Sequence, residues 1–198
     1  GGTSLAGQCT NAAVVMDLSV NCRAILGVDT AARTCRVEPG ITVDDLNDSI
    51  AATGLFFAPD PATSRHANIG GCIGNNAAGA RSVRYGRTSE SVLSVDVCLA
   101  DGRPATFGEG TDLRGAAERE ITLAVCEIVA RYAPLIRAKF PKTVRRNAGY
   151  GLDMVLNAME RGGWRGEAID AKARPAWLDR VNLAHLLCGS EGTLAFIA

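Results

Sequence analysis

The chain has 198 residues, 47% hydrophobic and 21% charged, so it can bury a core and is neither disordered nor fibrous. Its 21 basic residues equal its 21 acidic residues. A protein that binds nucleic acid through the phosphates needs excess positive charge, so nucleic acid is not an expected partner. No run approaches the roughly 20 apolar residues of a membrane-spanning helix, and no signal peptide is visible. We therefore expect a soluble, cytoplasmic protein.

Seven cysteines are spread along the chain, and no two form a CxxC pair. The sequence therefore gives no support for a redox pair or a metal site, and we expect no metal. An odd number at wide spacing is typical of reduced thiols that behave as small apolar side chains. We expect most of them to be buried, as in proteins of a reducing compartment.

The first residues are glycine-rich and polar. The chain opens on Gly1-Gly2-Thr3-Ser4 without Met, which places a functional-looking loop where a frayed terminus would be expected, so we expect a fragment. Residues 13–19 and 24–29 are β-type runs, and residues 34–38 alternate between apolar and polar. Together these runs suggest a small meander.

A short helix and a long loop follow. Thr42 and Asp45 have the spacing of a capping box, and Gly54 supplies a stop signal. One apolar face has helical spacing: Val43, Leu46 and Ile50. Residues 58–86 are then interrupted repeatedly by Gly, Pro and Asn, which predicts a long ordered loop. Loops of that length inside compact domains are usually functional.

The next segments favour a hairpin and a long helix. Residues 91–100 and 103–107 are predicted strands joined at Asp101-Gly102. Apolar residues at helical spacing from 121 to 136 predict the long helix, and Pro134 is expected to kink or end it.

The last fifty residues contain two more predicted helices and a closing strand. A short helix is expected at 152–159, and a polar, irregular surface insertion at about 160–180. Residues 183–187, which include His185, are expected to be helical and to lead into the glycine-rich loop 189–194. The apolar run that closes the chain is typical of a strand.

Three glycine-rich loops are the candidate ligand-binding segments. They are residues 1–8, 59–79 and 189–194. Missing side chains expose backbone N–H groups, which suit a pyrophosphate or a flat ligand, although each loop alone could also be ordinary turn chemistry. The first loop has neither the Gly-Lys-Ser/Thr ending of a Walker loop nor the GxGxxG spacing of a Rossmann fingerprint.

The order of the motifs resembles a known family. Along the chain they read GGTSLAGQ, VVMDLS, VEPGITVDDLN, GLFFAPDPAT, NIGGCIGNNAAG, VRYGRTSESVLSVDVCLADG, NAGYGLD and GSEGTLAFIA. This series closely resembles the FAD-binding, PCMH-type domain of the vanillyl-alcohol oxidase and p-cresol methylhydroxylase superfamily. Within it, the greatest likeness is to the FAD-linked D-lactate, glycolate and D-2-hydroxyglutarate dehydrogenases.

The resemblance implies an α+β fold, the PCMH-type (type 2) FAD-binding domain, which lays extended FAD between two lobes. Residues 1–198 would be a fragment of it, with the second lobe largely present and the first lobe and cap domain missing. The implied reaction oxidises a 2-hydroxy acid by hydride transfer to flavin N5, with an electron acceptor that the sequence does not identify. The substrate would be held by the missing cap domain, and no catalytic base can be named here.

The resemblance also implies which residues contact FAD. Those on the pyrophosphate loop are Gly1, Gly2, Thr3, Ser4, Gly7 and Gln8. Those running beside the pyrophosphate and flavin, with the turn that follows, are Pro59, Asp60, Ile69, Gly70, Gly71, Asn76, Gly79, Tyr85 and Gly86. Those of the late loop are Glu191, Gly192 and Thr193. Asn147, Gly149 and Tyr150 resemble a segment near the flavin face.

Some positions depart from the family pattern. Relatives that bind flavin covalently carry His in the first loop, which here reads Gly2-Thr3-Ser4, so noncovalent FAD is expected. Relatives also carry Gly at the position of Ala78 and Thr at that of Asn68. Neither His66 nor His185 is assigned as a base. Basic residues that could face phosphates or a substrate carboxylate, or equally the solvent, are Arg81, Arg84, Arg87, Arg145 and Arg146.

Two other functions stay open at this point. One is a binding or regulatory module that keeps the fold without turnover, since the chain itself lacks substrate residues. The other, drawn from the wider fold, is a reductase that uses NADPH and FAD. A flavin spectrum would favour a flavoenzyme, and NADPH oxidation by the complete protein would favour the reductase.

Overall fold

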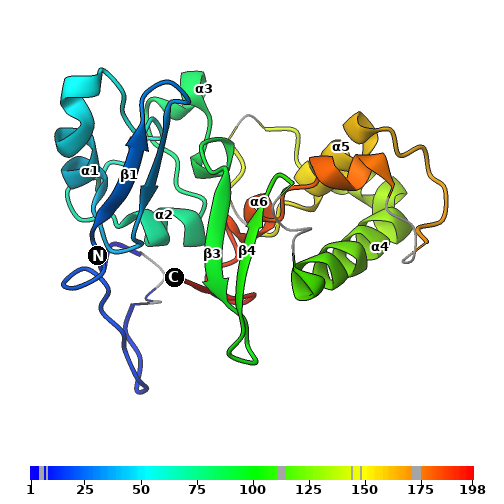
Figure 1. Cartoon of the computed structure of the whole chain (residues 1–198), viewed down its shortest axis with the longest axis horizontal. Coiled ribbons are helices and arrows are strands. Elements are labelled where there is room, and N and C mark those ends of the chain that lie inside the picture. Colours follow the sequence, from blue (N-terminus) through cyan, green and yellow to red (C-terminus); the bar gives the residue numbers. More distant parts are fainter. Residues whose placement is uncertain (5–6, 8, 111–114, 144, 148, 171–174) are drawn as a thin grey trace. The chain divides into compact units, whose positions relative to one another are not determined.

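The chain forms two compact units, Gly1–Ser91 and Val92–Ala198. The computed structural model describes residues 1–4, 7, 9–110, 115–143, 145–147, 149–170 and 175–198. Both units combine helices with antiparallel strands (Figure 1), which confirms the predicted α+β class.

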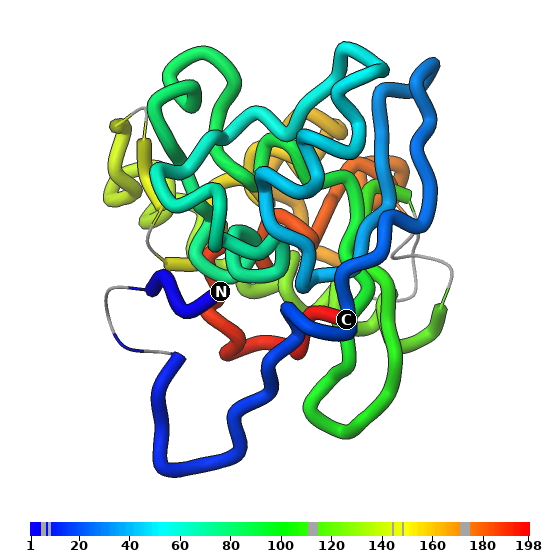
Figure 2. The backbone as a smooth tube through the Cα atoms, turned by 90° about the vertical axis from the view of Figure 1, so that its left-hand side faces the viewer, coloured from blue at the N-terminus to red at the C-terminus, as the bar shows by residue number. Residues whose placement is uncertain are grey.

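In the first unit, the predicted meander is reduced to a hairpin. β1 (Ile25–Asp29) pairs antiparallel with β2 (Thr34–Val37). Residues 13–19 form no strand, contrary to prediction, and lie in an open excursion of the chain (Figure 2). Their β-branched side chains favour a strand, but a strand also needs a backbone partner. Val14 is 90% exposed, far from the half-buried setting in which β propensity takes effect.

The first helix follows its sequence signals. α1 (Val43–Ile50) begins after Thr42, whose Oγ1 accepts a hydrogen bond from the Asp45 amide at 3.1 Å. Its buried residues are the three predicted ones, Val43, Leu46 and Ile50. A 3-10 turn, η1 (Ala51–Thr53), follows, and Gly54 ends it in the left-handed conformation at φ 73°. Only glycine adopts that conformation without steric cost.

The predicted long loop 58–86 contains helical turns. α2 (Ile69–Gly74), α3 (Ser82–Tyr85) and the 3-10 turn η2 (Thr88–Glu90) lie in or directly after it. Glycine costs about 1 kcal/mol in a helix relative to alanine, which is why composition favoured a loop. In α2 that cost is offset by burial of one apolar face: Ile69, Cys72 and Ile73.

The second unit contains a three-stranded sheet in the order β4-β3-β5. β3 (Ser94–Cys98) pairs antiparallel with β4 (Pro104–Gly108), as predicted, with Val95 opposite Phe107 and Val97 opposite Ala105. All four of these side chains are buried. β5 (Phe196–Ile197), the predicted closing strand, pairs with the other edge of β3.

Helices form the rest of the second unit. α4 (Ala116–Lys139) continues five residues beyond Pro134, so the predicted ending there is wrong. Proline costs about 3 kcal/mol in a helix interior, and burial of Ala133 and Ile136 on both sides opposes that cost. The predicted helices at 152–159 and 183–187 are confirmed. They and the turn between them are α5 (Leu152–Gly162), η3 (Ala176–Arg180) and α6 (Ala184–Leu187).

The cysteines are less buried than predicted. All seven are described, and all are free thiols. Only Cys72, Cys126 and Cys188 are buried, because the others lie on the hairpin strands and loops of the surface. Burial raises the pKa of Cys72 to about 12, so this thiol stays protonated and acts as a core side chain.

No described helix could cross a bilayer. Even α4, with 24 residues, carries too many charges along its length for a membrane-spanning segment.

Candidate functional site

In the first unit, the start of the chain lies against the segment that leads into α2 (Figure 2). A Cβ on Gly1 would fall 1.8 Å from the His66 carbonyl oxygen, a space that only glycine can occupy. Asn68 Nδ2 donates a hydrogen bond to the Gly40 carbonyl at 2.5 Å and fixes this segment from its other side. Two predicted loops are thus neighbours. Gln8 lies outside the described residues.

A second close approach joins both ends of the predicted loop 58–86. Pro59 and Asp60 lie against Gly79, where an added Cβ would fall 1.5 Å from the Asp60 carbonyl oxygen. Ser82 Oγ accepts a hydrogen bond from the Gly79 amide at 2.9 Å and donates one to the Pro59 carbonyl at 3.0 Å. The structure therefore brings together predicted residues that are about twenty positions apart.

Asn76 ties the same region to η2. Its Oδ1 accepts a hydrogen bond from the Ser89 amide at 2.9 Å, and Thr88 donates to the Ala77 carbonyl through both its amide and its Oγ1, each at 2.9 Å. Asn76 and Thr88 are buried. These bonds hold the backbone of 76–79 in place from its buried side.

Left-handed backbone is concentrated at predicted site residues. Among the described residues other than glycine, four have a positive φ: Arg33, Asp60, Asn76 and Glu191. The first lies in the β1–β2 turn, and the other three belong to predicted cofactor segments. Such conformations cost about 1–3 kcal/mol each and persist where the surroundings enforce them, which is common at ligand sites.

An aromatic and cationic cluster borders the Pro59–Asp60 turn. Arg81 Nε lies 3.2 Å from Asp60 Oδ2, and its guanidinium stacks 5.3 Å from the Phe56 ring centre. Phe56 in turn meets Tyr85 edge to face at 5.6 Å, and Arg84 lies over Tyr85. Sequence reasoning assigned Tyr85 to the site but not Phe56, although Phe56 lies in the motif GLFFAPDPAT.

Arg87 is not available to an external anion, because it is committed to Glu90. Its Nη2 lies 2.6 Å from Glu90 Oε1, and its amide donates to Glu90 Oε2 at 2.5 Å. Burial raises the pKa of the Glu90 carboxyl, but the hydrogen bonds from Arg87 outweigh it and leave the pKa below its ordinary value of 4.5.

Acid should weaken this clamp. A carboxyl whose pKa is depressed by folding contributes stability above its unfolded pKa, and that stability is lost as the pH falls through the folded value. We expect the free energy of unfolding to decrease as the pH drops under about 4.5. Glu90→Gln should make the free energy of unfolding depend less on pH in this range. Because Glu90 is 40% exposed, its loss at pH 7 should cost only about 1 kcal/mol.

Urea unfolding at pH 7 and pH 3.5 measures this difference. The matched control is Asp101→Asn, because Asp101 also pairs with an arginine but lies on a surface turn, where both partners are at least half exposed. It should change the pH dependence much less than Glu90→Gln. Equal effects from the two variants would contradict the assignment of the clamp to Glu90.

In the second unit, the two remaining predicted segments meet. Tyr150 Oη lies 2.9 Å from Thr193 Oγ1, although the residues are 43 positions apart. Thr193 also donates from Oγ1 to the Ser190 carbonyl at 2.5 Å, and Ser190 is buried. Gly149 and Gly192 both have positive φ and open space where a side chain would project. Gly149, Tyr150 and residues 191–193 thus form one exposed patch, while Asn147 is half-buried.

Arg146 and His185, two other candidate functional residues of this unit, are part of its packing. Arg146 Nη2 lies 2.5 Å from Asp153 Oδ1, with both side chains largely buried, and its guanidinium stacks on Phe140. Its charge is therefore neutralised within the unit. His185 lies half-buried on α6. No group of three metal-ligating side chains occurs among the described residues.

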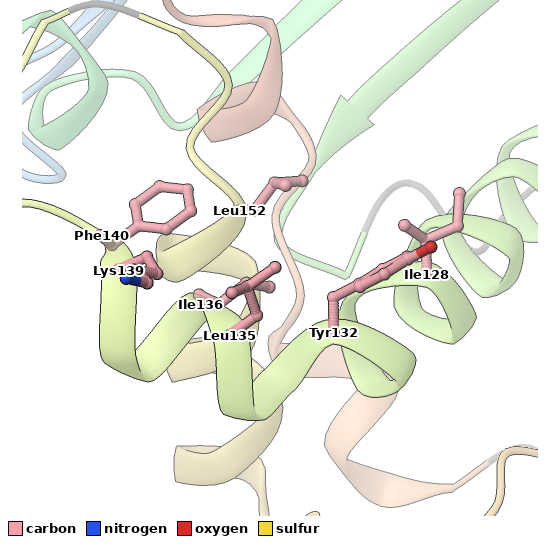
Figure 3. A pocket seen from close by; sticks show the side chains of 7 residues that line it. All are labelled: Ile128, Tyr132, Leu135, Ile136, Lys139, Phe140 and Leu152. Carbon is pink, nitrogen blue, oxygen red and sulfur yellow. The ribbon is translucent and has the colours of Figure 1, made fainter.

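An apolar groove of the second unit contains none of the predicted cofactor contacts. It has a volume of about 240 Å³ and lies along α4 (Figure 3). The surface inside it comes from apolar atoms alone, so it offers no partner to a phosphorylated ligand. It is lined by Ile128, Tyr132, Leu135, Ile136, Lys139, Phe140 and Leu152.

Comparison with known families gives one match. The model of the family described as "FAD binding domain" matches residues 1–123. The matched range contains the first two glycine-rich loops and crosses from the first compact unit into the β3–β4 hairpin of the second.

Curated relatives align with the chain at about one-third identity. D-2-hydroxyglutarate dehydrogenase of Pantoea ananatis is 33% identical over 205 residues, which covers 100% of this chain and 18% of the relative. A second relative is D-lactate dehydrogenase [cytochrome], mitochondrial, of Kluyveromyces lactis. It is 30% identical, and the alignment covers 81% of this chain and 31% of the relative. Glycolate oxidase subunit GlcD of Bacillus subtilis is 34% identical over 102 residues, 51% of this chain and 22% of its own. The chain thus spans about one-fifth to one-third of the length of these relatives.

Proposed function

This chain belongs to the FAD binding domain family, and from that membership we propose that it forms the FAD-holding part of a flavin-dependent dehydrogenase of 2-hydroxy acids. The observation that carries the proposal is the family match across residues 1–123. The names of relatives that align with the whole chain or most of it support the substrate class, since they are D-2-hydroxyglutarate and D-lactate dehydrogenases. Because the match crosses both compact units, we propose a single FAD-binding domain over 1–198, with an insertion at about 160–180.

The residues fit a flat, phosphorylated cofactor. Gly2, Gly71 and Gly192 have open space where a side chain would project, so a ligand could approach their backbone closely. We propose that noncovalent FAD is held by two groups of residues. The first is Gly1, Gly2, Thr3, Ser4, Gly7, Gln8, Pro59, Asp60, Ile69, Gly70, Gly71, Asn76, Gly79, Tyr85 and Gly86, and the second is Glu191, Gly192 and Thr193.

In this proposal FAD supplies the redox chemistry, and the protein chain binds and orients FAD. Bound FAD supplies a two-electron acceptor, so the hydride of the carbinol carbon would go to flavin N5. The part of this chain would be to bind and orient. Its buried clamps hold the backbone of 59–60 and 76–79, so that few groups need to reorganise when the ligand arrives. We assign no base, because neither His66 nor His185 lies among the proposed cofactor contacts.

The test uses the protein at its full natural length. Anaerobic addition of D-2-hydroxyglutarate, D-lactate or glycolate should bleach the visible flavin band for one of the three acids. A protein that stays colourless after reconstitution with FAD would refute the cofactor assignment. A coloured protein bleached by none of these acids would leave FAD binding standing and refute the substrate class, and bleaching by NADPH instead would identify a reductase.

A glycine pair in α2 gives a sharper test of the cofactor contacts. Both Gly71 and Gly74 have empty space at the position of a Cβ, and alanine favours a helix by about 1 kcal/mol. Neither substitution should destabilise the protein. Gly71→Ala should nonetheless weaken FAD binding about tenfold or more, because the added methyl group enters the proposed contact surface. Gly74→Ala should leave the Kd unchanged, and equal Kd values for both variants would remove Gly71 from the site.

A further inference from the structure

A single buried hydroxyl group joins two backbone segments of the first unit. Ser82, the first residue of α3, is 3% exposed. Its Oγ lies between the Pro59 carbonyl, to which it donates at 3.0 Å, and the Gly79 amide, from which it accepts at 2.9 Å. The Ser82 amide also donates to the Gly79 carbonyl at 3.0 Å. One residue thus binds both ends of the 58–86 stretch.

We infer that Ser82 is a positioning residue for the cofactor, an inference that rests on the proposed function. Ser82 itself is not among the proposed FAD contacts. Its role is to hold two backbone segments at a fixed separation. These segments, Pro59–Asp60 and Gly79, are proposed FAD contacts. A hydroxyl has one proton to donate and lone pairs to accept, so it can join a carbonyl and an amide at once, which no apolar side chain of similar size can do.

The backbone segments that Ser82 joins are closely packed and strained. Asp60 has φ 50°, a strained conformation that must be enforced by its neighbours. Gly79 lies so close to the Asp60 carbonyl that a Cβ would overlap it. The Arg81–Asp60 ion pair also links the two segments, but its side chains are 55% and 39% exposed, so it contributes little. Of these two links the buried hydroxyl is the stronger. Binding groups displaced by as little as about 0.5 Å lose productive geometry.

The chain offers a matched control at Ser89. Ser89 is fully buried, and its Oγ has no hydrogen-bond partner among the described residues. Ser82→Ala and Ser89→Ala therefore remove the same atom from equally buried sites, but only the first removes a tie between segments. In the full-length protein we expect Ser82→Ala to raise the Kd for FAD about tenfold and to change the visible spectrum of the bound flavin. Ser89→Ala should do neither.

Rescue separates positioning from general stability. Ser82→Thr keeps the hydroxyl and should restore the flavin spectrum and most of the affinity. Ser82→Ala leaves the Pro59 carbonyl and the Gly79 amide without this partner, so it should lower the midpoint of thermal unfolding without FAD, which Ser89→Ala should not. The spectrum of the FAD-saturated protein, recorded well below that midpoint, reports positioning separately from this loss of stability. If Ser82→Ala does not fold, Ser82→Cys, whose thiol is a weaker partner, should show an intermediate Kd. Wild-type affinity for FAD in Ser82→Ala, or in Ser82→Cys if Ser82→Ala does not fold, would overturn the inference. A wild-type protein that binds no FAD would instead overturn the proposed function.

Discussion

Replacing Gly79 by alanine should abolish measurable FAD binding and destabilise the protein by about 3 kcal/mol or more. The added methyl carbon would lie 1.5 Å from the Asp60 carbonyl oxygen and 2.7 Å from that of Pro59. Both obstacles are backbone atoms, so no side-chain rotation relieves the overlap. The Pro59–Asp60 turn must move away, and the Ser82 hydrogen bonds that hold it break.

Two measurements check this expectation: the urea midpoint of the protein without FAD, and the Kd for FAD. The control is Gly74→Ala, which makes the same chemical change where nothing beyond its own helix backbone lies within 4 Å of the new methyl group. A Gly79→Ala protein with the wild-type midpoint would mean that the two segments do not touch as described.

The second large effect is expected in the other unit. Trp177→Ala should lower the free energy of unfolding by about 3–5 kcal/mol, the usual cost of emptying a large aromatic site. Trp177, the second residue of η3, is 5% exposed and packs against the end of α5, where its Cβ lies only 2.6 Å from the place of a Cβ on Gly162. Glycine at 162 is what allows this contact, so alanine there should also destabilise the unit.

Denaturant unfolding followed by circular dichroism measures the loss. Leu135→Ala is the comparison, because Leu135 also belongs to the second unit but is 54% exposed on α4. It should cost well under 1 kcal/mol. A Trp177→Ala protein no less stable than Leu135→Ala would show that this ring does not anchor η3 against α5.

Several elements could be predicted from sequence because their signals are local. The helix of Val43–Ile50 has its cap, apolar face and glycine stop within a dozen residues, and each lies where expected. The hairpin of β3 and β4 has alternation on both strands and a tight turn between them. Predictions that needed a distant partner were less successful. Residues 13–19 have strand-like side chains, but no local feature tells whether another strand will pair with them.

The candidate site divides in the same way. Its glycine-rich loops could be recognised from composition and motif order, because each motif is contiguous. The Ser82 bridge, the Arg81–Asp60 pair and the Tyr150–Thr193 contact could not, since each joins residues brought together only by folding. Ser82 has no distinguishing neighbours in sequence. Its importance comes from the two backbone groups that its hydroxyl reaches.

The contact between Tyr150 and Thr193 also fixes the direction of a hydrogen bond. The Thr193 hydroxyl has one proton, and it is donated to the Ser190 carbonyl. The proton between the two side chains must therefore come from Tyr150, so its phenol oxygen has only lone pairs left. Any group that binds this oxygen from the exposed side has to supply the hydrogen itself, as an amine, amide or alcohol does and an ionised carboxylate cannot.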